Sequence, residues 1–143
     1  MTSKSHTGDT LFHQFKKELS NPIAMVLKAA EGVSVHEFDA LLKTSMLHKN
    51  QLAAFLGLTT KTIDNYHLKN KRLGRVESEH LLMLISLYKK GQEIFGSSVS
   101  FNKWLLVPAL GLGGYEAINL LYTPGGINLV MEELLRIEFG ALA

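Results

Sequence analysis

The residues that could support catalysis are few and follow no known catalytic pattern. The chain has six histidines and no cysteine, which excludes disulfides, cysteine-based zinc sites and a cysteine nucleophile. No two histidines have the His-x-x-x-His spacing of a helical metal site, and no Gly-x-Ser-x-Gly motif occurs. We therefore expect no enzyme and no catalytic residue, cofactor or metal, and we interpret His36, His48, His67 and His80 as surface residues.

Three glycines, Gly111, Gly113 and Gly114, gather within four positions. Glycine tolerates tight reversals and close backbone approach, so such a cluster could cradle a phosphate group. No Gly-Lys-Ser/Thr follows, however, which argues against a nucleotide-binding loop. We interpret the cluster as a turn.

A helix-turn-helix is indicated at about residues 49–68 by the spacing of small, flexible and apolar residues. Ala53 is small where the two helices would cross, and Gly57, four positions later, supplies a turn with positive φ. Ile63 faces the hinge between the helices, and Thr59 is placed to cap the second one. Several constraints therefore agree on this motif.

The second helix of this motif could enter the major groove of DNA. Asn65 could read adenine through its amide, and the basic residues could contact phosphate. Asp64 would repel phosphate and Leu68 offers no hydrogen bond, so the alternative is a helix-turn-helix used only for packing or dimerisation. The predicted DNA-binding residues are Thr60, Lys61, Asn65, Lys69, Lys71 and Arg72.

The C-terminal part carries a series of landmarks in a fixed order. Trp104-Leu105 is followed by Pro108 and a Leu-Gly-Gly turn, then by the Leu-Leu-x-Thr-x-x-Gly connection of residues 120–126, and finally by Arg-Ile-Glu-Phe-Gly at 136–140. These motifs resemble the C-terminal toxin-binding domain of the Xre/MbcA/ParS antitoxins, the partners of RES-domain toxins in bacterial type II toxin–antitoxin pairs. The resemblance covers most of residues 99–143. It departs at Ala117, where many members have proline, and at Tyr122, where an acidic residue is common.

The resemblance implies a function. In this family the C-terminal domain covers the catalytic cleft of an NAD-consuming toxin, residues near the antitoxin's C-terminus block that cleft, and the N-terminal region commonly represses the operon. We therefore expect an antitoxin that binds a cognate RES-domain toxin and operator DNA. The alternative is a free-standing transcriptional regulator whose C-terminal domain dimerises or senses a ligand. The expected toxin-binding residues are Trp104, Pro108, Gly113, Gly114, Arg136, Glu138, Phe139 and Leu142.

Two of these expectations have a structural alternative. Trp104 lies at an inward helical spacing, where a lone tryptophan usually packs in the core. Phe139 and Leu142 are apolar at the end of the chain, where a tail usually frays unless something receives it. They could enter a toxin or dock on the protein's own helices.

Composition indicates one globular protein. Of 143 residues, 46% are hydrophobic and 20% charged, which argues against disorder. The first ten residues have no apolar signal segment, and the apolar stretch around residues 104–112 is interrupted by Pro108 and Gly111, so we expect a cytoplasmic location. Residues 35–72 hold six Lys/Arg against three acids, whereas residues 99–143 hold two against four. This asymmetry suggests different partners for the two halves.

Helical spacing prevails throughout, which predicts an all-α fold. Ser34 and Glu37 should form a capping box. A long helix at residues 77–95 should end at Gly96, dividing the chain into an N-terminal helical region, 1–96, and a C-terminal domain, 99–143. Ser100 should cap a short helix through residue 104, and residues 115–122 should form another. Thr123, followed by proline, should open the last helix.

Apolar stripes at residues 11–19 and 23–30 exceed what a short helix-turn-helix core needs. Helix-turn-helix proteins usually read two half-sites by two-fold symmetry. We therefore expect a homodimer that pairs through its N-terminal helices.

Overall fold

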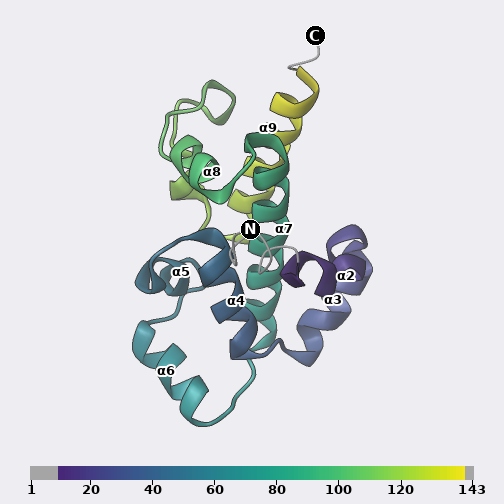
Figure 1. The fold of residues 1–143 in the computed structure, drawn as a ribbon, viewed down its shortest axis with the longest axis vertical. Coiled ribbons are helices and arrows are strands. Elements are labelled where there is room, and N and C mark those ends of the chain that lie inside the picture. The colour runs from purple at the N-terminus through teal and green to yellow at the C-terminus, as the bar shows by residue number, and fades with distance from the viewer. Residues whose placement is uncertain (1–9, 141–143) are drawn as a thin grey trace.

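The computed structural model describes residues 10–140, and these residues form helices and no strand, which confirms the all-α fold. Figure 1 shows their arrangement around one long helix, α7. The elements are α2 (Lys16–Ser20), α3 (Pro22–Glu31), α4 (Val35–Ser45), α5 (Lys49–Phe55), α6 (Thr60–Leu68), α7 (Arg75–Phe95), α8 (Ser98–Leu105), η1 (Leu110–Leu112), η2 (Ala117–Leu120) and α9 (Pro124–Gly140), where η denotes a 3-10 helix.

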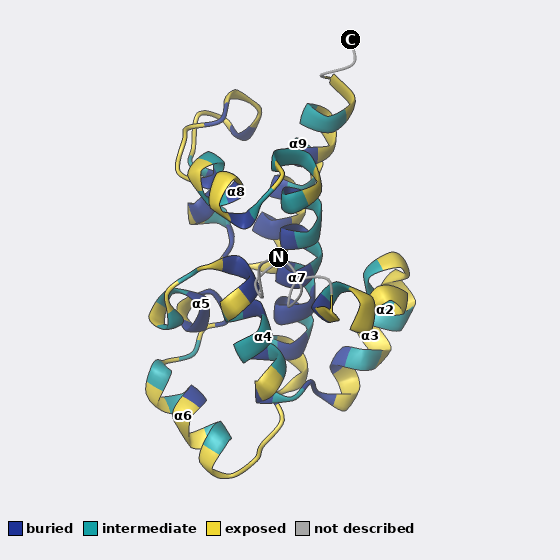
Figure 2. Cartoon of the chain, in the orientation of Figure 1, coloured by how far each residue is buried: buried dark blue, intermediate teal, exposed yellow. Residues whose placement is uncertain are grey.

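Helix α7 is the axis of the fold. Leu81, Leu84, Ile85 and Tyr88 recur at helical spacing and are fully buried. The helices α3, α8 and α9 all pack against it, and in Figure 2 most of its length is coloured as buried or intermediate. It ends at Gly96, whose φ of 90° is readily adopted only by glycine. The predicted end of this helix is therefore confirmed.

One hydrophobic core runs through both halves of the described chain. It includes Phe38 and Leu52 from the N-terminal region as well as Phe101 and Leu134 from the C-terminal region. Because α7 contacts helices from both regions, the two predicted units share their packing. The division at Gly96 stays a prediction.

His80, which we interpreted as a surface residue, is buried at 4% exposure. Three expectations about helix starts and lengths also require correction. Ser34 Oγ accepts the N–H of His36 at 3.1 Å, and the Glu37 carboxylate accepts from Gln14 instead of reaching back, so the capping box does not form. Helix α8 is capped by Ser97, whose Oγ accepts the N–H of Ser100. This cap moves the start of α8 three residues earlier than we expected.

The third correction concerns residues 115–122, where only the short η2 forms instead of a full helix. Thr123, in contrast, opens α9 as predicted: its Oγ1 accepts the N–H of Gly126 at 3.1 Å. Among residues 10–140, no helix has the length and apolarity needed to cross a membrane.

Candidate functional site

The segment predicted as a helix-turn-helix forms two short helices joined by a turn, which is compatible with that motif. Ala53 and Ile63 are fully buried where α5 and α6 meet. Gly57 has a φ of 73° in the turn between them, and Thr59 Oγ1 accepts the N–H of Thr62 at 3.2 Å as the N-cap of α6. The short turn and the cap together set the direction of α6 relative to α5.

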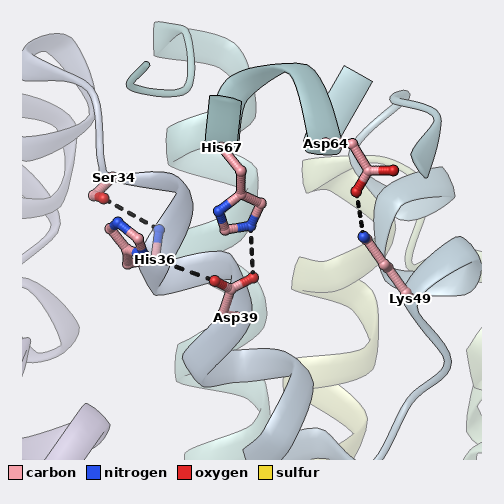
Figure 3. Close-up of polar contacts among 6 residues, drawn as sticks. All are labelled: Ser34, His36, Asp39, Lys49, Asp64 and His67. Carbon is pink, nitrogen blue, oxygen red and sulfur yellow. Dashed lines mark hydrogen bonds and ion pairs between the residues drawn. The ribbon is translucent and has the colours of Figure 1, made fainter. Parts of the chain in front are cut away.

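The outward face of α6 is polar at its centre. Lys61, Asp64 and Asn65 are exposed, and Thr60 is half-buried. Asp64 forms an ion pair with Lys49 of α5, in which Lys49 Nζ lies 2.5 Å from Asp64 Oδ1 (Figure 3). This pairing offsets the repulsion that Asp64 would otherwise exert on a phosphate group. Leu68 is 84% exposed at the end of the helix.

The predicted basic contacts differ in how firmly they are held. Lys71 Nζ lies 5.4 Å from the centre of the Tyr66 ring, a cation–π distance. Arg72 donates from Nη1 to the carbonyl of Gly32 at 2.7 Å. For Lys61 and Lys69, residues 10–140 provide no ion-pair partner. These two lysines are therefore the freest to meet an anion.

In the C-terminal region an aromatic cluster positions α8. Phe101 is fully buried and stacks on Phe95 and Trp104, with ring centres 5.9 and 6.1 Å apart, and meets Tyr88 edge to face at 5.0 Å. Trp104 is half-buried and stacks on Phe95 at 5.5 Å. Trp104 thus packs on the edge of the core, largely as its spacing suggested.

The loop after α8 is held in a tight reversal. Pro108 forms an isolated antiparallel bridge with Glu116, and Gly113 and Gly114 both have positive φ, at 68° and 83°. Leu110, which lies between Pro108 and Gly113, is 95% exposed. We did not single out Leu110 from sequence, although an apolar residue between a proline and a glycine cluster is a signal for a displayed side chain.

The C-terminal turns of α9 lie beside this loop. Arg136 pairs with Glu133 and also donates from Nη2 to the carbonyl of Gly111 at 3.4 Å. Glu138 pairs with Lys90 of α7 at 3.3 Å. Burial lowers the pKa of Lys90, but its bonds to Glu138 and Glu93 outweigh this effect and raise the pKa overall.

Of the two residues predicted for the tail, Phe139 is 66% exposed on the last turn of α9. It is therefore not docked on the protein's own helices. Leu142 lies outside the described residues. Because Glu138 is bound to Lys90, it holds α9 against α7 and is not a free carboxylate beside Phe139.

Exposed apolar side chains thus collect at one end of the molecule. We call this set the distal apolar surface; it comprises Leu106, Val107, Leu110, Tyr115 and Phe139, which are each 56–95% exposed. In Figure 1 the loop and the end of α9 lie at the top, and α6 lies at the bottom. The two candidate surfaces are therefore far apart, and one chain could use both at once.

Comparison with known proteins finds similarity to antitoxins. Residues 90–140 match the model of the antitoxin Xre/MbcA/ParS C-terminal toxin-binding domain. The matched segment begins in the last turns of α7 and includes Phe95, Phe101 and Trp104 of the aromatic cluster, the loop and α9. The chain is also 27% identical over 135 residues to the Prs ADP-ribosylating antitoxin of Sphingobium sp. (strain YBL2), covering 87% of this chain and 84% of that protein. These matches support an antitoxin of the Xre/MbcA/ParS type, with residues 90–140 similar to its C-terminal toxin-binding domain.

Proposed function

We propose that this chain neutralises a cognate RES-domain toxin by placing its distal apolar surface over the NAD-binding cleft of that toxin. The action is one of binding, without catalysis by the antitoxin, in the cytoplasm. The name of the Sphingobium relative connects that protein with ADP-ribosylation, a reaction that uses NAD. The proposed NAD-consuming toxin would use the same substrate as an ADP-ribosylation reaction.

The observation that carries this proposal is the exposure of Leu110 and Phe139. Leu110 is 95% exposed and Phe139 66% exposed, in a region whose family model describes toxin binding. Exposed apolar side chains that cluster usually mark an interface. The loop and α9 are linked through Arg136 and Gly111, so the partner would meet a preformed surface and lose little entropy on binding.

The test is a comparison of exposed apolar residues at the two ends of the molecule. Leu110→Ser and Phe139→Ser should each weaken binding to the toxin encoded beside this gene by roughly 30-fold or more, the effect of losing an interface anchor of about 2 kcal/mol. Val76→Ser is the matched control, because Val76 is 71% exposed at the start of α7. Isothermal titration and protection in co-expression give the readout.

Equal binding by all three variants would show that the toxin contacts another surface. Thermal melts of each variant alone would separate this result from unfolding. Because Leu110 and Phe139 are mostly exposed, their replacement should leave the melting temperature close to that of the parent protein.

We further propose that α6 binds operator DNA and so represses the operon. The basic balance of residues 35–72 and the exposed positions of Lys61 and Asn65 support this role. The other proposed contacts are Thr60, Lys69, Lys71 and Arg72, although Arg72 is engaged with Gly32. Lys61 and Asn65 are therefore the most informative positions.

Lys61→Ala should weaken binding to the upstream DNA and flatten its salt dependence, because each phosphate contact releases a counterion. Asn65→Ala should relax sequence preference. Lys103→Ala, on the exposed surface of α8, serves as the control for charge alone. Absence of salt-sensitive binding by the unmodified protein would leave the helix-turn-helix as a packing element.

For assembly we propose a homodimer that pairs through α3. Ile23, Val26 and Leu27 lie on one face of this helix and are 71%, 54% and 62% exposed. A two-fold axis would place this face against its own copy and hide the apolar stripe. Light scattering at tens of micromolar should give a dimer mass, and Leu27→Lys should give a monomer; a monomeric parent protein would contradict the proposal.

The second candidate, a free-standing regulator, is favoured only by the helix-turn-helix geometry. In that case the gene would have no toxin-sized neighbour, and the distal apolar surface would mediate dimerisation or ligand binding. Co-purification with the product of the adjacent reading frame distinguishes the two.

A further inference from the structure

Three side chains with metal-binding atoms meet between α4 and α6, and neither proposed surface uses them. His36 and Asp39 lie one helical turn apart on α4, and His67 lies in the last turn of α6. Figure 3 shows the His67 ring above the Asp39 carboxylate, with the His36 ring directed at the same carboxylate. Residues spaced i and i+3 share one face of a helix, which explains why two of the three point the same way.

The distances within this cluster are short. His67 Nε2 lies 3.0 Å from Asp39 Oδ1, and His36 Nδ1 lies 3.8 Å from Asp39 Oδ2. The two imidazole rings are 5.6 Å apart at their centres, and one ligand atom from each residue lies within 4.8 Å of the other two. In a tetrahedral zinc site with bonds of about 2.0–2.1 Å, ligand atoms lie roughly 3.3 Å apart. Small side-chain rotations would therefore bring the three atoms to a common centre.

We propose that His36, Asp39 and His67 form a binding site for a divalent transition-metal ion, with Zn²⁺ as the ion that fits best. Two imidazole nitrogens and one carboxylate oxygen are a donor set that suits zinc, whereas Mg²⁺ and Ca²⁺ prefer oxygen ligands alone. Water would occupy the fourth position, since the three side chains are 68%, 40% and 31% exposed. Such an open site predicts moderate affinity, on the order of 1 μM.

The backbone around the cluster favours this arrangement. Ser34 Oγ accepts the N–H of His36 and so fixes the first turn of α4, from which His36 projects. The neighbouring Glu37 carboxylate is engaged with Gln14 and does not compete for the metal. Of the three ligands, only His67 comes from the other helix, so a bound ion would tie α6 to α4 in place of the hydrogen bond between His67 and Asp39.

Metal binding at this cluster would be independent of DNA and toxin binding. A metal bound here would fix the C-terminal turn of α6 against α4 whatever α6 contacts. By mass action, an ion that binds the folded chain more tightly than the unfolded one also raises its melting temperature. Both effects can be measured on the protein alone.

The test uses the full chain without a polyhistidine tag. Titration with Zn²⁺ by calorimetry, and with Co²⁺ by visible absorption, should show one equivalent bound. His67→Gln retains an amide N–H that can bond to Asp39 but removes a ligand, and His36→Gln removes the most exposed ligand. Each should weaken Zn²⁺ binding at least tenfold. His48→Gln and His13→Gln, whose histidines lie outside the cluster, should bind like the parent protein.

Melting curves give an independent readout. Excess Zn²⁺ should raise the melting temperature of the parent protein by several degrees and leave that of His67→Gln and His36→Gln unchanged. Without metal, all variants should melt close to the parent protein, which shows that they fold. The proposal is overturned if the parent protein binds no Zn²⁺ at tens of micromolar, or if the cluster variants bind as tightly as the His48 and His13 controls.

Discussion

Gly91 of α7 lies directly against the ring of Phe101 in α8, and its replacement by alanine should destabilise the protein. A Cβ at this buried position would lie 2.4–2.6 Å from three atoms of the Phe101 ring. Carbon atoms pack best at about 3.5–4.0 Å, so the ring would have to retreat by roughly 1 Å. Phe101 is itself fully buried against Tyr88, Phe95 and Trp104, and no direction of retreat is free.

Two opposing terms set the magnitude. Overpacking a dense core costs about 1–3 kcal/mol, whereas exchanging glycine for alanine inside a helix contributes up to about 1 kcal/mol of stability. The Gly91→Ala variant should therefore lose about 1–2 kcal/mol in the free energy of unfolding. For a chain of this size the melting temperature would fall by roughly 3–8 °C.

Urea unfolding followed by circular dichroism measures this loss. Gly125→Ala is the matched control, because a Cβ at Gly125 in α9 meets no atom within 4 Å; it should be neutral or stabilising. Adding Phe101→Leu to Gly91→Ala should cost less than the sum of the single changes, since the smaller side chain relieves the contact. A Gly91→Ala variant as stable as the parent protein would refute the described packing of α8 on α7.

Three further predictions concern the core. Burial lowers the pKa of His80 below its usual 6.5, although its hydrogen bond to the Leu121 carbonyl raises it in part. As the pH falls, the unfolded chain therefore binds this proton before the folded chain does, and the free energy of unfolding should decrease below about pH 6.5. Urea unfolding from pH 7 to 5 should show a shallower decrease for His80→Gln. Gly126→Ala would place a Cβ 1.8 Å from a backbone carbonyl oxygen and should destabilise the protein by at least about 2 kcal/mol in the same assay, unlike Gly125→Ala. Tyr88→Phe removes a 2.6 Å hydrogen bond to an amide oxygen and should cost about 1–3 kcal/mol; an unchanged midpoint would mean that water replaces the donor.

Local structure and the resemblance to antitoxins could be predicted from the sequence because short segments encode them. The turn at Gly57, the cap at Thr59, the stop at Gly96 and the start of α9 at Thr123 each depend on residues within a few positions. The C-terminal motifs likewise follow one another within residues 99–143. The capping predictions at Ser34 and Ser100 were wrong because each helix start offers two alternatives. At Ser34 two nearby N–H groups could donate to the hydroxyl, and at α8 two nearby serines could be the cap; the backbone angles decide between them.

The contacts of the candidate toxin-binding residues could be predicted from the sequence only in part. The position of Phe139 near the end of the given sequence already suggested that its apolar side chain could be exposed. The ion pair between Glu138 and Lys90 could not be predicted in this way, because the two residues lie 48 positions apart. Helical spacing shows which side chains share a face, yet it does not show what covers that face. Ile23, Val26 and Leu27 form a clear stripe in sequence, and only the packing of α3 on α7 reveals that the stripe faces outward.

The cluster of His36, Asp39 and His67 was decided by tertiary structure alone. Its histidines have no paired spacing in sequence and were therefore interpreted as separate surface residues. They come together because the turn after α5 directs α6 back across α4, which brings His67 within 3.0 Å of Asp39. Sequence determines what each segment can form; the distances between segments depend on how their buried faces pack, and sites built from several segments depend on those distances.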